Sequence, residues 1–383
     1  ISGHRFDHLL ENMGNLRKLQ GPILLHVLTS KGKGYRPAEQ DPITFHGTGP
    51  FDVASGTQLK TEAPAPSYTK VFASALLKLA REDERIVAIT AGMPSGTGLD
   101  AFSREFPDRF FDVGIAEQHA ITFAAGMATG GMNPVTAIYS TFLQRGYDQM
   151  LLDVCYQKLP VVFVIDRAGI VGEDGATHNG LFDLSFLRCI PHLVIMAPRD
   201  ENELQHMLKS ALHYECPVAI RYPRGSGLGV KLDEELRIIE LGKAEVMRDG
   251  RGLALLPIGA SVYPAMEAAD RLAREGIDAC VVNCRFVKPL DTDLVCGLAR
   301  SHKHIITIEE NVLAGGFGSA VLEALGEQGI NDIAVRRLGI NDRFVEHGSQ
   351  AIIRTKYRLD ADSIAAAARE MVGVRQGIIA GKG

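Results

Sequence analysis

The chain has 383 residues, of which 46% are hydrophobic and 23% are charged, and its 41 basic and 46 acidic residues give a formal net charge of −5. This length and apolar content suit two folded domains plus a remainder, and they exclude a wholly disordered chain. Because there is no basic excess, nothing global attracts nucleic acid or an anionic membrane, and any anion site must be built locally.

The sequence has no run of 18 apolar residues and no start typical of a secretory signal, which predicts a cytoplasmic protein with no membrane partner. Its cysteines lie in apolar or strand-like stretches without the Cys/His spacing of a zinc site. We therefore expect reduced core thiols at all six positions: Cys155, Cys189, Cys216, Cys280, Cys284 and Cys296.

Short runs rich in Val and Ile alternate with amphipathic helical stretches, a pattern typical of the α/β class with parallel sheets covered by helices. The first part is predicted to contain a helix at 6–19, a strand at 23–29 and a glycine-rich basic loop at 31–35. A linker with two prolines follows at 56–66.

A helix at 68–81 is predicted to open the second part, and we expect its strands at 86–90, 110–113, 135–138, 161–165, 193–197 and 218–221. In the third part, we expect strands at 253–257, 279–282, 305–309 and 333–336. The predicted division of the chain is therefore 1–60, 61–235 and 236–383.

The segment 111–127 carries the most informative candidate for chemistry. A predicted strand ends at Val113, Gly114 makes the turn, and Glu117 falls in the first turn of a helix rich in small residues. An acidic residue at this position often only complements the helix dipole, so that interpretation stays open from this segment alone.

Five blocks in order along the chain carry a family resemblance. They are 29–35 with 41–46, 112–119, 139–145, 166–178 and 221–225. By these blocks, the sequence resembles the deoxyxylulose-phosphate synthase branch of the transketolase superfamily over essentially its whole length. The resemblance implies a thiamine-diphosphate enzyme, with a pyrimidine-binding domain at 61–235, a transketolase C-terminal domain at 236–383, and the tail of an N-terminal diphosphate-binding domain at 1–60.

The resemblance assigns Glu117 to the activation of thiamine diphosphate, across a homodimer interface. A carboxylate that holds a proton at N1′ of the aminopyrimidine favours the imino tautomer, which activates the cofactor. The resemblance also implies that Phe142 stacks on the aminopyrimidine, although a core phenylalanine is its ordinary role. It brings Lys31 and Lys33 toward the diphosphate, although a basic glycine-rich loop is often a plain turn.

The implied substrates are pyruvate and glyceraldehyde 3-phosphate. A transferase of this kind decarboxylates pyruvate and joins the remaining two carbons to the aldehyde, giving 1-deoxy-D-xylulose 5-phosphate for isoprenoid, thiamine and pyridoxal-phosphate synthesis. The residues that the resemblance implies for substrate are Tyr139, Arg167 and Arg224 near the phosphate, Asp174 and His178 near the reacting carbons, and His46 for proton exchange beside the thiazolium. Arginine suits this role because its planar guanidinium binds phosphate through two parallel hydrogen bonds.

The family's Mg²⁺ ligands begin with a Gly-Asp-Gly motif, which this sequence lacks. We expect those ligands in an N-terminal domain that precedes Ile1, and we predict no metal ligand in this chain. Three alternatives stay open: transketolase itself, a 2-oxoacid dehydrogenase β subunit, and a nucleotide-binding protein suggested by Gly315-Gly-Phe-Gly318. That loop lacks full GxGxxG spacing, and a tight turn into a helix explains its glycines without a ligand.

Overall fold

The computed structural model of the chain describes residues 1–59 and 65–373. The chain divides into two compact units, Ile1–Ala63 and Pro64–Gly383, which are described separately. The division at 60 and 235 predicted from the sequence stays a prediction.

The first unit contains two helices, α1 (Phe6–Leu16) and α2 (Arg36–Gln40). The strand predicted at 23–29 is wrong, because this segment pairs with the chain start only through an isolated bridge between Leu28 and Ser2 and a hydrogen bond from the Ile1 amino group to the His26 carbonyl. An apolar run forms a stable strand only beside a partner that buries it, and Leu24 is 94% exposed.

The second unit begins with a seven-stranded sheet in the order β10-β5-β6-β4-β3-β1-β2. All six strands predicted between 86 and 221 are present and parallel, whereas β10 is antiparallel to β5 and was not predicted. The strands are β1 (Ile86–Thr90), β2 (Phe110–Asp112), β3 (Asn133–Tyr139), β4 (Val162–Asp166), β5 (Val194–Met196), β6 (Val218–Arg221) and β10 (Phe286–Lys288).

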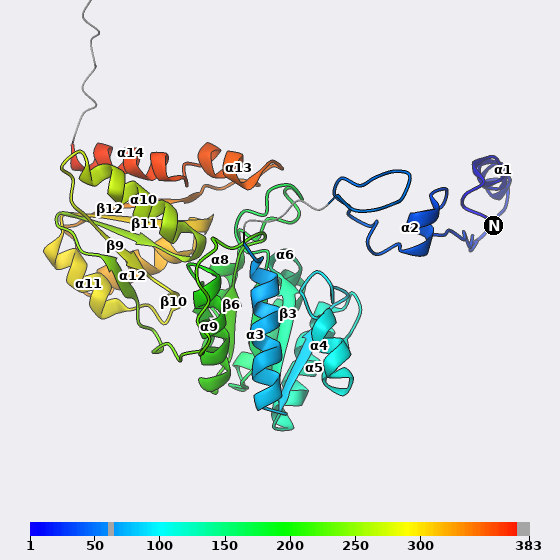
Figure 1. Cartoon of the computed structure of the whole chain (residues 1–383), viewed down its shortest axis with the longest axis horizontal. Helices are drawn as coiled ribbons and strands as arrows, with labels where there is room; N and C mark the ends of the chain where they lie inside the picture. The colour runs from blue at the N-terminus through cyan, green and yellow to red at the C-terminus, as the bar shows by residue number, and fades with distance from the viewer. Residues whose placement is uncertain (60–64, 374–383) are drawn as a thin grey trace, which may run out of the picture. The chain divides into compact units, whose positions relative to one another are not determined.

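Helices cover both faces of this sheet, as Figure 1 shows. Since successive side chains of a strand point to opposite faces, Val162 and Val164 pack toward one group of helices while Phe163 and Ile165 pack toward the other. On the first face lie α3 (Tyr68–Glu82) and α9 (Glu201–His213), and on the second α5 (Glu117–Thr129) and α8 (Asp183–Arg188). Three shorter helices border them: α4 (Asp100–Glu105), α6 (Ser140–Leu143) and α7 (Tyr147–Gln149).

A five-stranded sheet follows, in the order β12-β11-β8-β9-β7. Its strands are β7 (Glu245–Arg248), β8 (Leu253–Pro257), β9 (Ala279–Asn283), β11 (His304–Val312) and β12 (Ala334–Ile340). The four predicted strands are confirmed, and the antiparallel β7 was not predicted. The helices are α10 (Val262–Ala273) and α14 (Ala361–Val372) on one face, α11 (Thr292–Ser301) and α12 (Phe317–Glu327) on the other, and α13 (Gln350–Lys356).

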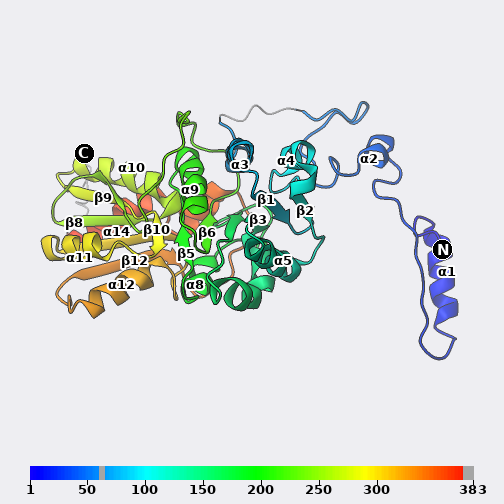
Figure 2. The same cartoon turned by 90° about the horizontal axis from the view of Figure 1, so that it is seen from below.

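One apolar core runs between the two sheets. Phe163 and Ile165 of the first sheet belong to the same buried cluster as Leu256 and Val282 of the second sheet and Phe317 of α12. Figure 2 shows β10 beside β5, so the later part of the chain also supplies the last strand of the first sheet. The two sheets therefore support one another.

The six cysteines are free, and four of them are buried: Cys155, Cys280, Cys284 and Cys296. The prediction of core thiols is wrong for Cys189, which is exposed, and Cys216 is only half-buried. Cys189 follows α8 at the end of its last turn, where an apolar environment is not required.

The turn that follows the first sheet is held by a buried carboxylate. Glu201 is fully buried at the start of α9, and its two oxygens accept the backbone N–H groups of Leu228, Gly229 and Val230 at 2.7–3.1 Å. This turn comes directly after Arg224, so Glu201 fixes the backbone just beyond a candidate site residue.

We expect Glu201→Gln to lower the free energy of unfolding by about 1.5–3 kcal/mol, because the amide loses a charged hydrogen bond and turns an N–H donor toward N–H groups of the turn. Urea unfolding of the chain measures this change. Glu327→Gln, at an exposed position, is the matched control. Equal midpoints for the two variants would contradict the assigned role of Glu201.

Candidate active site

Most of the candidate residues follow parallel strands of the first sheet at their carboxyl ends. Glu117 comes after β2, Tyr139 ends β3, Arg167 follows β4, and Arg224 follows β6. In open α/β sheets, ligands bind in the crevice outside this edge. The topology therefore gathers these residues at the edge where a ligand is expected.

Glu117 is the first residue of α5 and only 3% exposed. Its Oε2 atom is buried and accepts no hydrogen bond from any residue in the ranges 1–59 and 65–373. Arg145 Nη1 lies 3.0 Å from that oxygen and forms an ion pair with it, but the two are not aligned as a hydrogen bond. A buried carboxylate oxygen is rarely left without a partner, because desolvation makes this costly.

The helix-dipole interpretation does not account for this geometry. The α5 helix has no side-chain cap at its N-cap residue Ala116. Glu117 lies near the positive end of the helix, and among the described residues its Oε2 atom has an ion-pair partner in Arg145 but no aligned hydrogen-bond donor. A ligand N–H is a donor of the required kind.

An aromatic cluster joins two of the predicted segments. The Phe142 ring stacks on Tyr139, with centroids 5.5 Å apart, and meets the His178 ring edge-on at 5.7 Å. The Thr141 hydroxyl donates to the carbonyl of Thr177 at 2.8 Å and holds the two segments together. Phe142 is half-buried, so part of its ring stays available for contact.

Arg167 lies over the Tyr139 ring, with the guanidinium carbon 3.7 Å from the ring centroid. Its backbone φ of 60° is in the left-handed region, which is uncommon for a residue other than glycine and often marks functional sites. Gly96 contacts both side chains. Its carbonyl accepts a hydrogen bond from Arg167 Nη1 at 3.0 Å, and a Cβ atom at this position would collide with the Tyr139 hydroxyl. Burial raises the pKa of Tyr139 to about 12, which keeps its hydroxyl protonated.

Asp166, the last residue of β4, contacts the Arg167 guanidinium and helps to hold it over the Tyr139 ring. It is fully buried, and its Oδ2 atom accepts the hydroxyls of Thr69 at 2.8 Å and Tyr222 at 3.3 Å. Its Oδ1 atom lies 3.0 Å from Arg167 Nη1. Burial raises the pKa of Asp166, although the Arg167 charge and the two hydroxyl groups act in the opposite direction.

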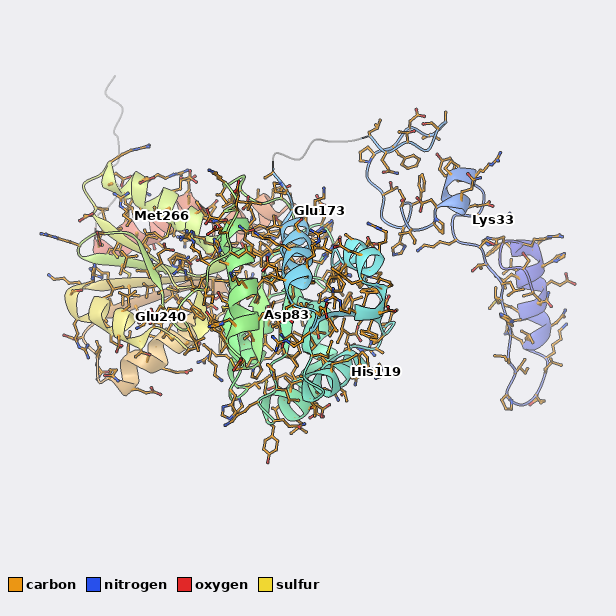
Figure 3. All side chains as sticks on the ribbon, turned by 60° about the horizontal axis from the view of Figure 1, so that its bottom comes forward. Lys33, Asp83, His119, Glu173, Glu240 and Met266 are labelled. Carbon is orange, nitrogen blue, oxygen red and sulfur yellow. The ribbon has the colours of Figure 1, made fainter. Side chains whose placement is uncertain are left out.

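Arg224 faces an acidic segment of the loop that follows β4. Its Nη1 atom is 3.2 Å from Asp174 and 3.8 Å from Glu173, which Figure 3 labels. A cavity of about 270 Å³ lies beside it, lined by Val171, Glu173, Arg224, Gly225 and Gln350. The cavity combines a guanidinium, a carboxylate, an amide and backbone, a mixture suited to a small polar ligand.

Three predicted residues belong to the first unit, Ile1–Ala63. Lys31, Lys33 and His46 are all exposed, and Lys33 lies 3.7 Å from Glu39. Their assignment to the diphosphate and to proton exchange stays a prediction.

The described ranges 1–59 and 65–373 hold no group of three His, Cys, Asp or Glu residues placed to bind a metal ion. Within the same ranges, no helix combines the length and apolar character needed to cross a membrane.

The glycine-rich loop before α12 is filled by the chain itself. The Glu309 carboxylate accepts the N–H groups of Phe317 and Gly318 at 2.7 and 2.8 Å. These are the N–H groups that a nucleotide phosphate would use at a helix N-terminus. Since a buried carboxylate occupies this position, the nucleotide-binding alternative is not favoured.

Sequence reasoning missed four residues that shape the site: Gly96, Arg145, Asp166 and Gln350. Arg145 and Asp166 lie inside the blocks that carry the resemblance, so a signal for them existed. Gly96 and Gln350 gave none, because their contacts with the site are made across long stretches of sequence.

Two family models match the chain. The transketolase pyrimidine-binding domain matches residues 64–228, and the transketolase C-terminal domain matches residues 242–364. A solved structure titled split gene transketolase, inactive beta4 tetramer, is 32% identical, with a TM-score of 0.72 over 82% of this chain and 100% of that chain. The chain belongs to the transketolase family.

Curated relatives within the transketolase family are more similar still. The 1-deoxy-D-xylulose-5-phosphate synthase of Heliobacterium modesticaldum is 59% identical over 97% of this chain, and synthase 1 of Geobacter sulfurreducens is 57% identical over 98%. The chain spans 57% and 59% of the lengths of these two relatives. The resemblance seen in the sequence is thereby confirmed at the level of the family.

Proposed function

We propose that this chain serves a thiamine-diphosphate enzyme that decarboxylates pyruvate and joins the remaining two carbons to glyceraldehyde 3-phosphate, giving 1-deoxy-D-xylulose 5-phosphate. The observation that carries the proposal concerns the buried Glu117 oxygen at the carboxyl edge of the sheet that holds Tyr139, Arg167 and Arg224: in the described part of the chain, no group donates a hydrogen bond to it. The names of the curated relatives support the same reaction.

Glu117 and Phe142 fit the aminopyrimidine end of the cofactor. Glu117 offers a carboxylate oxygen that can hold a proton at the ring nitrogen N1′, and Phe142 offers a half-buried aromatic face. When bound, thiamine diphosphate supplies the thiazolium carbon that carries the two carbons derived from pyruvate. The chain's own contribution is to hold the N1′ proton and to orient the ring.

Arg167, Tyr139 and Arg224 fit the phosphate of the acceptor. Arg167 is held in place by Tyr139, Asp166 and Gly96, so little side-chain freedom remains to be lost on binding. Arg224 is 34% exposed and borders a cavity, so its guanidinium is accessible to a phosphate. Two guanidinium groups supply the local positive charge that a phosphate requires, although the chain as a whole has a net charge of −5.

The remaining roles belong to the same proposal. Asp174 and His178 lie close to the reacting carbons of the bound substrates, and the His178 ring packs against Phe142. His46 exchanges protons, Lys31 and Lys33 approach the diphosphate, and Mg²⁺ binds through ligands outside this chain. The enzyme acts as a homodimer in the cytoplasm.

For Glu117→Gln in the intact enzyme, we expect turnover to fall by roughly 10² to 10⁴-fold, because the amide cannot share the N1′ proton as a carboxylate does. Unfolding in urea is expected to change little, since the ion pair that is lost involves Arg145, whose side chain is 55% exposed and stays solvated without it. Glu84→Gln, at an exposed position, is the control for the carboxylate-to-amide change. Near-normal turnover of Glu117→Gln would remove Glu117 from the reaction.

Arg224→Lys should raise the KM for glyceraldehyde 3-phosphate roughly ten- to a hundredfold and leave the KM for pyruvate unchanged, because only the aldehyde carries a phosphate. Steady-state kinetics with glyceraldehyde 3-phosphate and with unphosphorylated glyceraldehyde measure the effect. Arg251→Lys, at an exposed position, is the matched control. If Arg224→Lys discriminates between the two aldehydes as well as the wild type, Arg224 does not bind the phosphate.

The 383-residue chain expressed alone should fold and form a homodimer but show no synthase turnover with added thiamine diphosphate and Mg²⁺. Glu117 and Phe142 would contact only the aminopyrimidine ring of the cofactor. The doubly charged diphosphate requires a metal ion with oxygen ligands. Sedimentation, calorimetric titration and a synthase assay test this expectation, with the separately expressed N-terminal domain of a relative as the complementing control. Micromolar cofactor binding and turnover by the chain alone would contradict it.

A further inference from the structure

The loop at 167–180 leaves β4 and carries three proposed site residues, Arg167, Asp174 and His178. It is closed at its base by Gly169 and Gly180, which exchange two backbone hydrogen bonds of 2.7 and 2.9 Å. Arg167 lies just before this closure, where the Ala168 N–H donates to the Tyr222 carbonyl at 3.0 Å. The position of the loop relative to the segment after β6 therefore contributes to the spacing of the two proposed phosphate-binding arginines.

Residues of the later sheet hold this loop from outside. The Ile170 side chain is fully buried in the apolar cluster that contains Val345 and Ile353. Its backbone N–H donates to Glu310 Oε2 at 3.0 Å, and the other Glu310 oxygen accepts from Arg354 at 2.5 Å. The loop is thus anchored in a core to which the first sheet's own helices do not belong.

Gln350 bridges the loop to the segment that follows β6. It is the first residue of α13, and its Nε2 atom donates to the carbonyl of Ile170 at 2.8 Å and to the carbonyl of Arg224 at 3.1 Å. Both protons of one amide are therefore used on two different loops. Gln350 also lines the 270 Å³ cavity beside Arg224.

We propose that Gln350 is a positioning residue, which sets the distance between the loop at 167–180 and Arg224 so that both arginines address one phosphate. This inference rests on the proposed function and names a role for the later sheet in it. Recognition of a phosphate by two guanidinium groups depends on their relative placement, and shifts of less than 1 Å are costly at such sites.

The bridge requires a side chain that can donate two hydrogen bonds from one nitrogen, as the glutamine amide does. A leucine fills a similar volume but has no donor, so both carbonyls lose their partner. A glutamate keeps the length and shape but places an acceptor against two carbonyl oxygens and a negative charge in the cavity that Arg224 also lines. The two variants remove the bridge for different reasons and should act in the same direction.

The test uses the full enzyme and steady-state kinetics with pyruvate and either glyceraldehyde 3-phosphate or unphosphorylated glyceraldehyde. For Gln350→Leu, we expect the KM for glyceraldehyde 3-phosphate to rise roughly five- to thirtyfold, the range for one or two lost amide hydrogen bonds. The KM for pyruvate and the kcat/KM for unphosphorylated glyceraldehyde should stay within about twofold of the wild type, because neither depends on the phosphate contacts.

Ser349→Ala is the matched control. The Ser349 hydroxyl accepts the N–H of Ile352 at 3.4 Å and caps α13, so its loss weakens the same helix end while leaving the Gln350 amide in place. We expect Ser349→Ala to keep the wild-type preference for the phosphorylated aldehyde. Equal shifts in Ser349→Ala and Gln350→Leu would overturn the proposal, because they would indicate only a weakened helix.

Gln350→Glu is the second variant, and it tests the bridge if Gln350→Leu does not fold. A loss of preference for the phosphorylated aldehyde in Gln350→Glu supports the bridge, and an unchanged preference in either folded variant overturns it. Failure of the proposed function has a different signature, since the wild-type enzyme would then give no product from pyruvate and glyceraldehyde 3-phosphate.

Discussion

A buried ion pair between Arg221 and Asp183 joins the elements on which the candidate site depends. Arg221 is 5% exposed and Asp183 is fully buried, and Nε and Oδ2 are 3.0 Å apart. Arg221 also donates to the carbonyls of Gly180 and Glu310, both at 3.2 Å, while Asp183 accepts the Ser140 hydroxyl at 3.0 Å. Removing one partner of such a pair leaves an uncompensated buried charge, so the pair is costly to separate. Its contacts therefore hold together β6, the 180–183 segment, β11 at Glu310 and the start of α6 at Ser140.

The parallel strands were predictable because their signal is local. The runs Ile86–Thr90 and Val218–Arg221 are apolar up to their last residue and buried along their whole length, so composition alone predicts them. Glu245–Arg248 and Phe286–Lys288 carry no such signal, since both are short and mix charged with apolar residues. The opposite error at 23–29 has the same cause, because an apolar run does not reveal whether a partner strand is present.

The candidate site was predictable to the extent that its residues lie in continuous motifs. Glu117, Tyr139 and Arg167 stand in blocks that a family resemblance can identify. What the sequence could not show is that the Glu117 oxygen is buried beside Arg145 without an aligned hydrogen bond from the described residues, or that Gly96 leaves room for the Tyr139 hydroxyl. These are properties of packing between segments far apart in the chain, and they appear only when the fold brings the segments together.

The pairing of β10 with β5 has a consequence for how the protein is made. During synthesis, β1 to β6 emerge first, and their parallel sheet can assemble while the later residues are still missing. The backbone N–H and C=O groups on the outer side of β5 then stay open until Phe286–Lys288 has left the ribosome. An open, apolar strand edge is a site where chains pair wrongly with one another. The nascent chain should therefore be most prone to aggregation in that interval, and chaperones that bind exposed strand edges should engage it there.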